Sequence, residues 1–126
     1  RDACLLAVGA MVETAEKVRE GLRAEGIDVA VVNCRFVKPL DGVLLRELAG
    51  RYPVLITLEE NTLRGGFGDG VHEFLHEAGV QTGALHHAGL PDRFVTHGSM
   101  TQLLDEVGLS AAELVARVRA WAKGRA

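Results

Sequence analysis

Residues 54–70, VLITLEENTLRGGFGDG, contain the pattern from which the architecture of the chain follows. The apolar run 54–58 has the length of a buried strand, and Pro53 in front of it stops the preceding helix. The glycines downstream form a turn, after which we expect a helix that ends near Gly79. Strand, turn and helix in this order are typical of the repeating unit of an α/β sheet.

The same alternation continues toward both ends of the chain. Four further apolar runs have the length of strands, at 3–8, 29–34, 84–87 and 94–96. Four further segments have helical periodicity, at 11–25, 42–52, 99–107 and 110–123. Asp41 and Ser110 are well placed to cap two of these helices. We therefore predict one three-layer α/β/α domain over residues 1–126, with a mostly parallel, five-stranded sheet.

Composition limits the classes of function. The 126 residues have a net charge of −3 with acids and bases interspersed, which argues against a nucleic-acid surface or a polybasic membrane anchor. No apolar run approaches the roughly 18 residues of a membrane span, and no leader pattern precedes the first strand, so we expect a cytoplasmic location. Cys4 and Cys34 are expected to be buried free thiols. The chain lacks an initiator methionine and enters a strand at once, which we interpret as a domain cut from a longer protein.

The segment His72-Glu73-Phe74-Leu75-His76 matches the His-Glu-x-x-His pattern of zinc hydrolases, in which two histidines on one helix face bind the metal. The longer form of the pattern fails, because Thr82 stands where a third histidine ligand is required. We favour an amphipathic surface helix and predict no metal site in this chain. Its core stripe would consist of Val71, Phe74, Leu75 and Ala78.

The glycine-rich turn at 64–70 is a second candidate site. Backbone N–H groups and the helix dipole converge at the amino end of a helix, where they attract an anion. The turn matches neither a dinucleotide fingerprint nor a P-loop, and Asp69 would oppose a phosphate. The alternative is that the glycines serve a sharp turn or a close contact with another segment.

Charged residues follow the second and third predicted strands, and the carboxyl ends of parallel strands lie along one edge of a sheet. Because these charged residues have apolar neighbours, they are consistent with a contact surface. The alternative, which stays open, is that they only cap helices and form local ion pairs. Together with the glycines of the turn, the candidate interdomain or dimer interface comprises Arg35, Lys38, Asp41, Glu59, Glu60, Asn61, Gly65, Gly66 and Gly68.

Three segments resemble the C-terminal domains of the transketolase family. Residues 35–41, RFVKPLD, resemble the linker of these domains, which also occurs in the β subunits of 2-oxo acid dehydrogenases. Residues 59–61 with the glycine-rich turn, and residues 89–98, GLPDRFVTHG, are similar to segments of the deoxyxylulose-phosphate synthases within this family. The resemblance covers essentially the whole chain, in the right order.

This resemblance implies a mixed five-stranded sheet in the order 1-3-2-4-5, with the first strand antiparallel to the rest. It implies a homodimeric transferase that uses thiamine diphosphate and Mg²⁺ to condense pyruvate with D-glyceraldehyde 3-phosphate, releasing carbon dioxide. The product, deoxyxylulose phosphate, feeds isoprenoid and thiamine synthesis. Two preceding domains of such an enzyme bind the cofactor, and their motifs are absent here. No catalytic or cofactor-binding residue is therefore carried over to this chain.

The implied role of the domain is packing against the middle domain of the same enzyme and against the homodimer partner, and the isolated domain is expected to be inactive. A docking domain of a 2-oxo acid dehydrogenase β subunit, which engages an acyltransferase core, is an alternative. Residues 90–94, LPDRF, argue against that alternative. A zinc hydrolase through His72, Glu73 and His76 is the remote third hypothesis.

Overall fold

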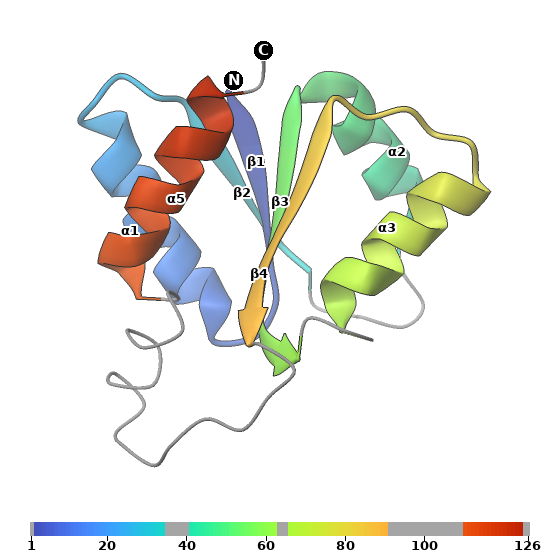
Figure 1. Cartoon of the computed structure of the whole chain (residues 1–126), viewed down its shortest axis with the longest axis horizontal. Helices are drawn as coiled ribbons and strands as arrows, with labels where there is room; N and C mark the ends of the chain where they lie inside the picture. The colour runs from blue at the N-terminus through green and yellow to red at the C-terminus, as the bar shows by residue number, and fades with distance from the viewer. Residues whose placement is uncertain (1, 35–40, 63–65, 91–109, 125–126) are drawn as a thin grey trace.

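The computed structural model describes residues 2–34, 41–62, 66–90 and 110–124. The elements in chain order are β1 (Ala3–Ala7), α1 (Met11–Arg23), β2 (Val29–Asn33), α2 (Gly42–Arg51), β3 (Val54–Thr62), α3 (Phe67–Glu77), β4 (Ala84–Leu90) and α5 (Ala111–Lys123). All four strands are parallel and form one sheet in the order β2-β1-β3-β4. Helices α1 and α5 cover one face of the sheet, and α2 and α3 cover the other (Figure 1). The predicted three-layer α/β/α architecture is therefore confirmed.

Two details that the family resemblance implied are wrong for the first strand of this chain. Strand β1 is parallel to its neighbours rather than antiparallel, and it lies inside the sheet between β2 and β3. The physical reason is that all five residues of β1 are fully buried, which requires a strand on each side and a helix layer on each face. Removing the first strand from the implied order 1-3-2-4-5 and renumbering the rest in chain order gives the observed order β2-β1-β3-β4. The predicted strand at 94–96 and helix at 99–107 lie outside the described residues.

Alternation along the strands creates two separate cores. In β1, Leu5 and Ala7 face α1 and α5, whereas Cys4 and Leu6 face α2 and α3. Helix α5 contributes a stripe of fully buried residues to the first core, made of Leu114, Val118 and Ala122. Strands that are apolar on both faces are thus buried on both faces, as the predicted parallel sheet requires.

Helix boundaries follow the predicted caps. Asp41 Oδ1 accepts a hydrogen bond from the Leu44 N–H at 3.0 Å, and Ser110 Oγ accepts one from the Glu113 N–H at 3.3 Å. Gly26 and Gly79 follow α1 and α3 with φ of 79° and 68°, a left-handed conformation that favours glycine after a helix.

The two cysteines are free thiols, as predicted; Cys4 is buried, whereas Cys34 is only partly buried. Burial raises the pKa of Cys4 to about 12 and that of Cys34 to about 11. Both sulfurs are therefore protonated and unreactive at neutral pH. In the part of the chain that the structure describes, no helix has the length and apolar character needed to span a membrane.

Candidate functional site

The carboxyl ends of β3 and β4 meet the amino end of α3 at one edge of the sheet, the lower edge in Figure 1. Strand β3 continues to Thr62, four residues beyond the predicted end, so Glu59, Glu60 and Asn61 belong to the strand rather than to a loop. Gly66 is the N-cap of α3, and Gly68 is buried in its first turn. Arg35, Lys38 and Gly65 of the candidate interface lie outside the described residues.

Glu59 is fully buried, and its carboxylate holds the amino end of α3. One carboxylate oxygen accepts the Phe67 N–H and the other accepts the Gly68 N–H, both at 2.6 Å. These N–H groups open the helix and have no acceptor within it, and the positive end of the helix dipole favours a negative charge at the same place. The anion position that the glycine-rich turn predicted is thus filled by a carboxylate of the chain itself.

Two opposing influences act on the proton affinity of this carboxyl. Burial is the larger influence and raises the pKa of Glu59 above its ordinary value. The N–H donors of Gly68 and Phe67 lower the pKa in part, and the Asp69 carboxylate raises it further. Glu59 therefore takes up a proton at a higher pH than an exposed glutamate does.

A second polar contact lies beside the first. The buried Thr57 is the register partner of His87 on β4, and its hydroxyl forms a hydrogen bond with His87 Nδ1 at 2.7 Å. Gly68 closes over this pair: a Cβ at Gly68 would lie 2.5 Å from His87 Nδ1 and 2.7 Å from Thr57 Oγ1. Glycine is therefore required at this position for close packing, which is one of the two roles that the sequence suggested for these glycines.

The His-Glu-x-x-His segment lies on α3 as the amphipathic interpretation predicts. Val71 and Leu75 are buried, whereas His72, Glu73 and His76 are exposed. The rings of His72 and His76 are stacked with centroids 6.5 Å apart. Within residues 2–34, 41–62, 66–90 and 110–124, no group of three His, Cys, Asp or Glu side chains is arranged to hold a metal ion. The zinc hypothesis therefore gains no ligand set from these residues.

Local capping accounts for both carboxylates of the candidate interface whose contacts are described. The Asp41 side chain is exposed and caps α2, and the Glu59 side chain is internal and caps α3. Asp41 stays accessible to a partner, whereas both oxygens of the Glu59 carboxylate already accept hydrogen bonds inside the domain. A role of these residues in an interface stays a prediction.

Sequence reasoning missed the residues around Glu59 that complete this polar cluster. The available signal was alternation, because Thr57 and Glu59 share one face of β3 with the buried Leu55. Two polar residues on a buried face require internal partners. His86, next to His87, points to the opposite face and stacks on Trp121 of α5 with ring centroids 4.6 Å apart.

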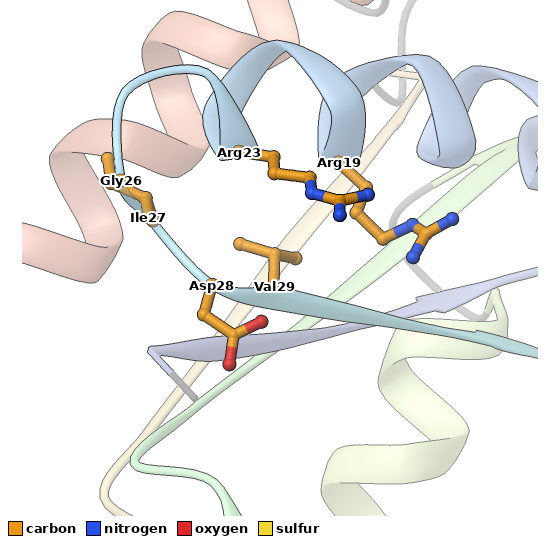
Figure 2. Close-up of a pocket in the computed structure, with 6 residues that line it drawn as sticks. All are labelled: Arg19, Arg23, Gly26, Ile27, Asp28 and Val29. Carbon is orange, nitrogen blue, oxygen red and sulfur yellow. The ribbon is translucent and has the colours of Figure 1, made fainter.

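A groove that the sequence did not predict lies at the opposite end of the sheet (Figure 2). It measures about 460 Å³ and is lined by Arg19, Arg23, Gly26, Ile27, Asp28 and Val29. Its arginines already contact acidic neighbours on α1, Arg19 with Glu16 at 2.7 Å and Arg23 with Glu20 at 3.8 Å. The groove follows the start of β2, which pairs with β1 alone among the described strands and is therefore one of the two edge strands of the sheet that they form.

Comparison with known proteins identifies relatives of this fold and sequence. The model of the family "Transketolase, C-terminal domain" matches residues 1–114. The 1-deoxy-D-xylulose-5-phosphate synthase of Geobacillus thermodenitrificans is 44% identical over 119 residues, which are 94% of this chain and 19% of that protein. A synthase of the same name from Geobacter metallireducens is 47% identical over 123 residues, 98% of this chain and 20% of that protein. The chain thus spans about a fifth of the length of these curated relatives.

Solved structures agree with this assignment of the fold. A split-gene transketolase, described as an inactive β4 tetramer, superposes with a TM-score of 0.88 at 32% identity, over 99% of this chain and 40% of that one. Transketolase from Pichia stipitis superposes with a TM-score of 0.70 at 16% identity, over 98% of this chain and 16% of that one. The second likeness concerns the fold alone.

Proposed function

The chain belongs to the transketolase C-terminal domain family, and we propose that it is the C-terminal domain of a 1-deoxy-D-xylulose-5-phosphate synthase. The resemblance to these synthases that the sequence indicated is confirmed by relatives of that name at 38–48% identity. The parent enzyme would condense pyruvate with D-glyceraldehyde 3-phosphate in the cytoplasm. Thiamine diphosphate, held with Mg²⁺ by other domains, would supply the carbanion chemistry of the reaction.

The proposed role of this domain is assembly: it packs against the preceding domains of the same enzyme and contributes to a homodimer. The observation that carries this proposal is the use of the polar groups at the carboxyl edge of the sheet. Glu59 binds the amino end of α3, Asp41 caps α2, and Thr57 bonds to His87. Side chains at the carboxyl edge of the sheet, where α/β domains usually bind ligands, thus form hydrogen bonds that stabilise the fold.

The position of β2 at the edge of the described sheet supports a packing role. Native proteins cover or blunt the edges of their sheets, because an unpaired strand invites association with another chain. Among the described strands β2 pairs only with β1, and the groove of Figure 2 runs beside it. We propose that the rest of the parent polypeptide covers this edge.

The split-gene transketolase supports the expectation that the isolated domain is inactive. That protein contains a region similar to this whole chain and is described as an inactive β4 tetramer. A chain that carries this domain without the rest of the enzyme would, by analogy, fold and associate but not catalyse.

The isolated 126-residue chain is expected to show no binding of thiamine diphosphate with Mg²⁺ in a calorimetric titration. The diphosphate is held through a metal ion, and the described residues offer no group of three suitable ligands. An intact synthase, measured in parallel, controls for active cofactor and should give a clear binding isotherm. Micromolar binding by the isolated chain would contradict the assignment of cofactor binding to other domains.

Deleting residues 1–126 from the parent polypeptide is expected to abolish both the condensation activity and the dimer, as measured by product formation and sedimentation velocity. Adding the separate chain back should restore part of both, because the interface is rebuilt from its two halves. A truncated parent that stays dimeric and fully active would refute the assembly role.

A further inference from the structure

Helix α3 presents two imidazoles to solvent, one helical turn apart. His72 and His76 are four positions apart, which places them on the same face of the helix. Their rings are parallel to within 4°, with centroids 6.5 Å apart, and both side chains are exposed. Neither ring forms a hydrogen bond or an ion pair with another described residue, so ring nitrogens of both histidines are accessible to a ligand.

The charges of α3 favour a cation beside these two rings. The helix contains three carboxylates, those of Asp69, Glu73 and Glu77, and no lysine or arginine. The Arg46 guanidinium of α2 lies over the ring of Phe74 at 5.8 Å. Phe74 is two positions from each histidine and therefore lies on the other side of the helix. The field at the histidine face is thus negative, and it attracts a metal cation rather than an anion.

A third protein ligand is missing at this face, and its absence limits what a bound metal would do. His87 of β4 meets His72 edge-on with ring centroids 6.4 Å apart, but it is half-buried and its Nδ1 forms a hydrogen bond with the Thr57 hydroxyl. Among the residues that the structure describes, no three His, Cys, Asp or Glu side chains are arranged around a metal position. Catalytic zinc takes three protein ligands, so two histidines make a binding site and not a hydrolase centre.

We propose that His72 and His76 form a two-histidine site, which chelates one divalent transition-metal ion of the kind that prefers imidazole, with water in the other coordination positions. Two imidazole nitrogens bound to one ion at about 2.0–2.1 Å lie about 3 Å apart, and exposed side chains reach that spacing by rotation about their χ angles. Among ions of this kind, Cu²⁺ should bind more tightly than Ni²⁺ or Zn²⁺. The two-histidine site does not rest on the proposed function, which assigns thiamine diphosphate and Mg²⁺ to other domains.

An ion held across one turn would stabilise the helical form of the carboxyl half of α3. The two nitrogens have the required spacing only while the turn is helical, so the ion binds the folded chain better than the unfolded one. A ligand with this preference raises the midpoint of thermal unfolding, and the rise increases with the concentration of free metal.

The test is titration of the 126-residue chain with CuCl₂ and with ZnCl₂, followed by calorimetry and NMR. We expect one ion to bind per chain. Zn²⁺ should shift the ring resonances of His72 and His76 together, before those of the other histidines. Cu²⁺ at less than one equivalent should broaden the same resonances first, because a paramagnetic ion acts on the nuclei nearest to it.

Three substitutions show whether the two rings act as one chelate. His72→Gln and His76→Gln each remove one ligand and keep a polar side chain of good helix propensity. Because the second nitrogen binds within the same molecule, losing either one should weaken Cu²⁺ binding by at least about tenfold. His86→Gln is the matched control, because His86 stacks on Trp121 of α5 on the opposite face of the sheet, and it should leave the affinity unchanged.

Two results would overturn the two-histidine site. A loss of affinity of only about twofold in each single variant would mean that the histidines bind metal independently, as two equal sites without a chelate. Binding that persists at wild-type strength when both histidines are replaced would place the ion elsewhere in the chain. Neither result would affect the assignment of the chain to its family, which rests on other residues.

Discussion

Replacing Glu59 with alanine is expected to lower the free energy of unfolding by about 3–5 kcal/mol, measured by urea denaturation at pH 7. The substitution removes two charge-assisted hydrogen bonds of 2.6 Å and leaves the N–H groups of Phe67 and Gly68 buried without an acceptor. Each bond to a charged group contributes about 1.5–3 kcal/mol, and a buried donor left unpaired costs about 1–3 kcal/mol. The loss should appear in α3 first, because this contact fixes its amino end.

Two further variants make the Glu59 result specific. Glu59→Gln keeps one acceptor oxygen and should lose about half as much stability, because its amide N–H₂ then faces a backbone donor. Glu47→Ala on α2 removes an exposed glutamate that meets Arg51 at 3.7 Å, and should change stability by less than about 0.5 kcal/mol. Equal, small effects at positions 59 and 47 would mean that the carboxylate does not hold the helix.

Replacing Gly68 with alanine is expected to destabilise the domain by about 2–3 kcal/mol, the cost of overpacking a buried site. The new methyl group would lie 2.5 Å from His87 Nδ1 and 2.7 Å from Thr57 Oγ1, and those two atoms cannot separate without losing their hydrogen bond. The same urea titration, followed by circular dichroism, measures the effect.

Gly50→Ala is the matched control for this substitution, because Gly50 is also helical and exposed and a Cβ there meets nothing within 4 Å. Alanine should stabilise α2 by about 0.5–1 kcal/mol through helix propensity. In addition, His87→Ala should partly rescue Gly68→Ala, because it removes the ring that the methyl group strikes. A destabilised Gly50→Ala, or no rescue by the double variant, would argue against the steric explanation.

Patterns that depend on near neighbours predicted the structure well. The caps Asp41 and Ser110 follow from spacing within one helical turn and are confirmed. The predicted core stripe of α3 is confirmed for Val71 and Leu75, which are buried, whereas Phe74 and Ala78 are only partly buried. The position of β1 was not given by such local patterns. Whether a strand lies inside or at the edge of a sheet depends on which strands its neighbours pair with, and the family analogy applied to β1 an antiparallel position that β1 does not occupy.

At the candidate site, too, contacts between residues that are distant in the sequence could not be predicted. The sequence placed Glu59 in the candidate interface, because its charge suggested a surface residue. It does not show that the amino end of α3, eight and nine residues later, returns to the Glu59 carboxylate. Thr57 and His87 are separated by thirty residues, and only the β3–β4 register brings them together. A polar residue on the buried face of a strand was the one available signal, and it predicts a partner without identifying it.

The stack of His86 on Trp121 has a practical consequence for optical experiments. Trp121 is the only tryptophan of the chain, and Arg117 covers its ring at 4.9 Å while His86 lies parallel to it at 4.6 Å. Its fluorescence therefore reports on the seam between β4 and α5, where a nearby imidazole quenches emission when it becomes charged. The α2 and α3 layer lies on the far side of the sheet and contains no such chromophore among its described residues. Tryptophan emission thus reports on the layer formed by α1 and α5. Structural changes at the glycine-rich turn, on the other face of the sheet, should leave the emission unchanged.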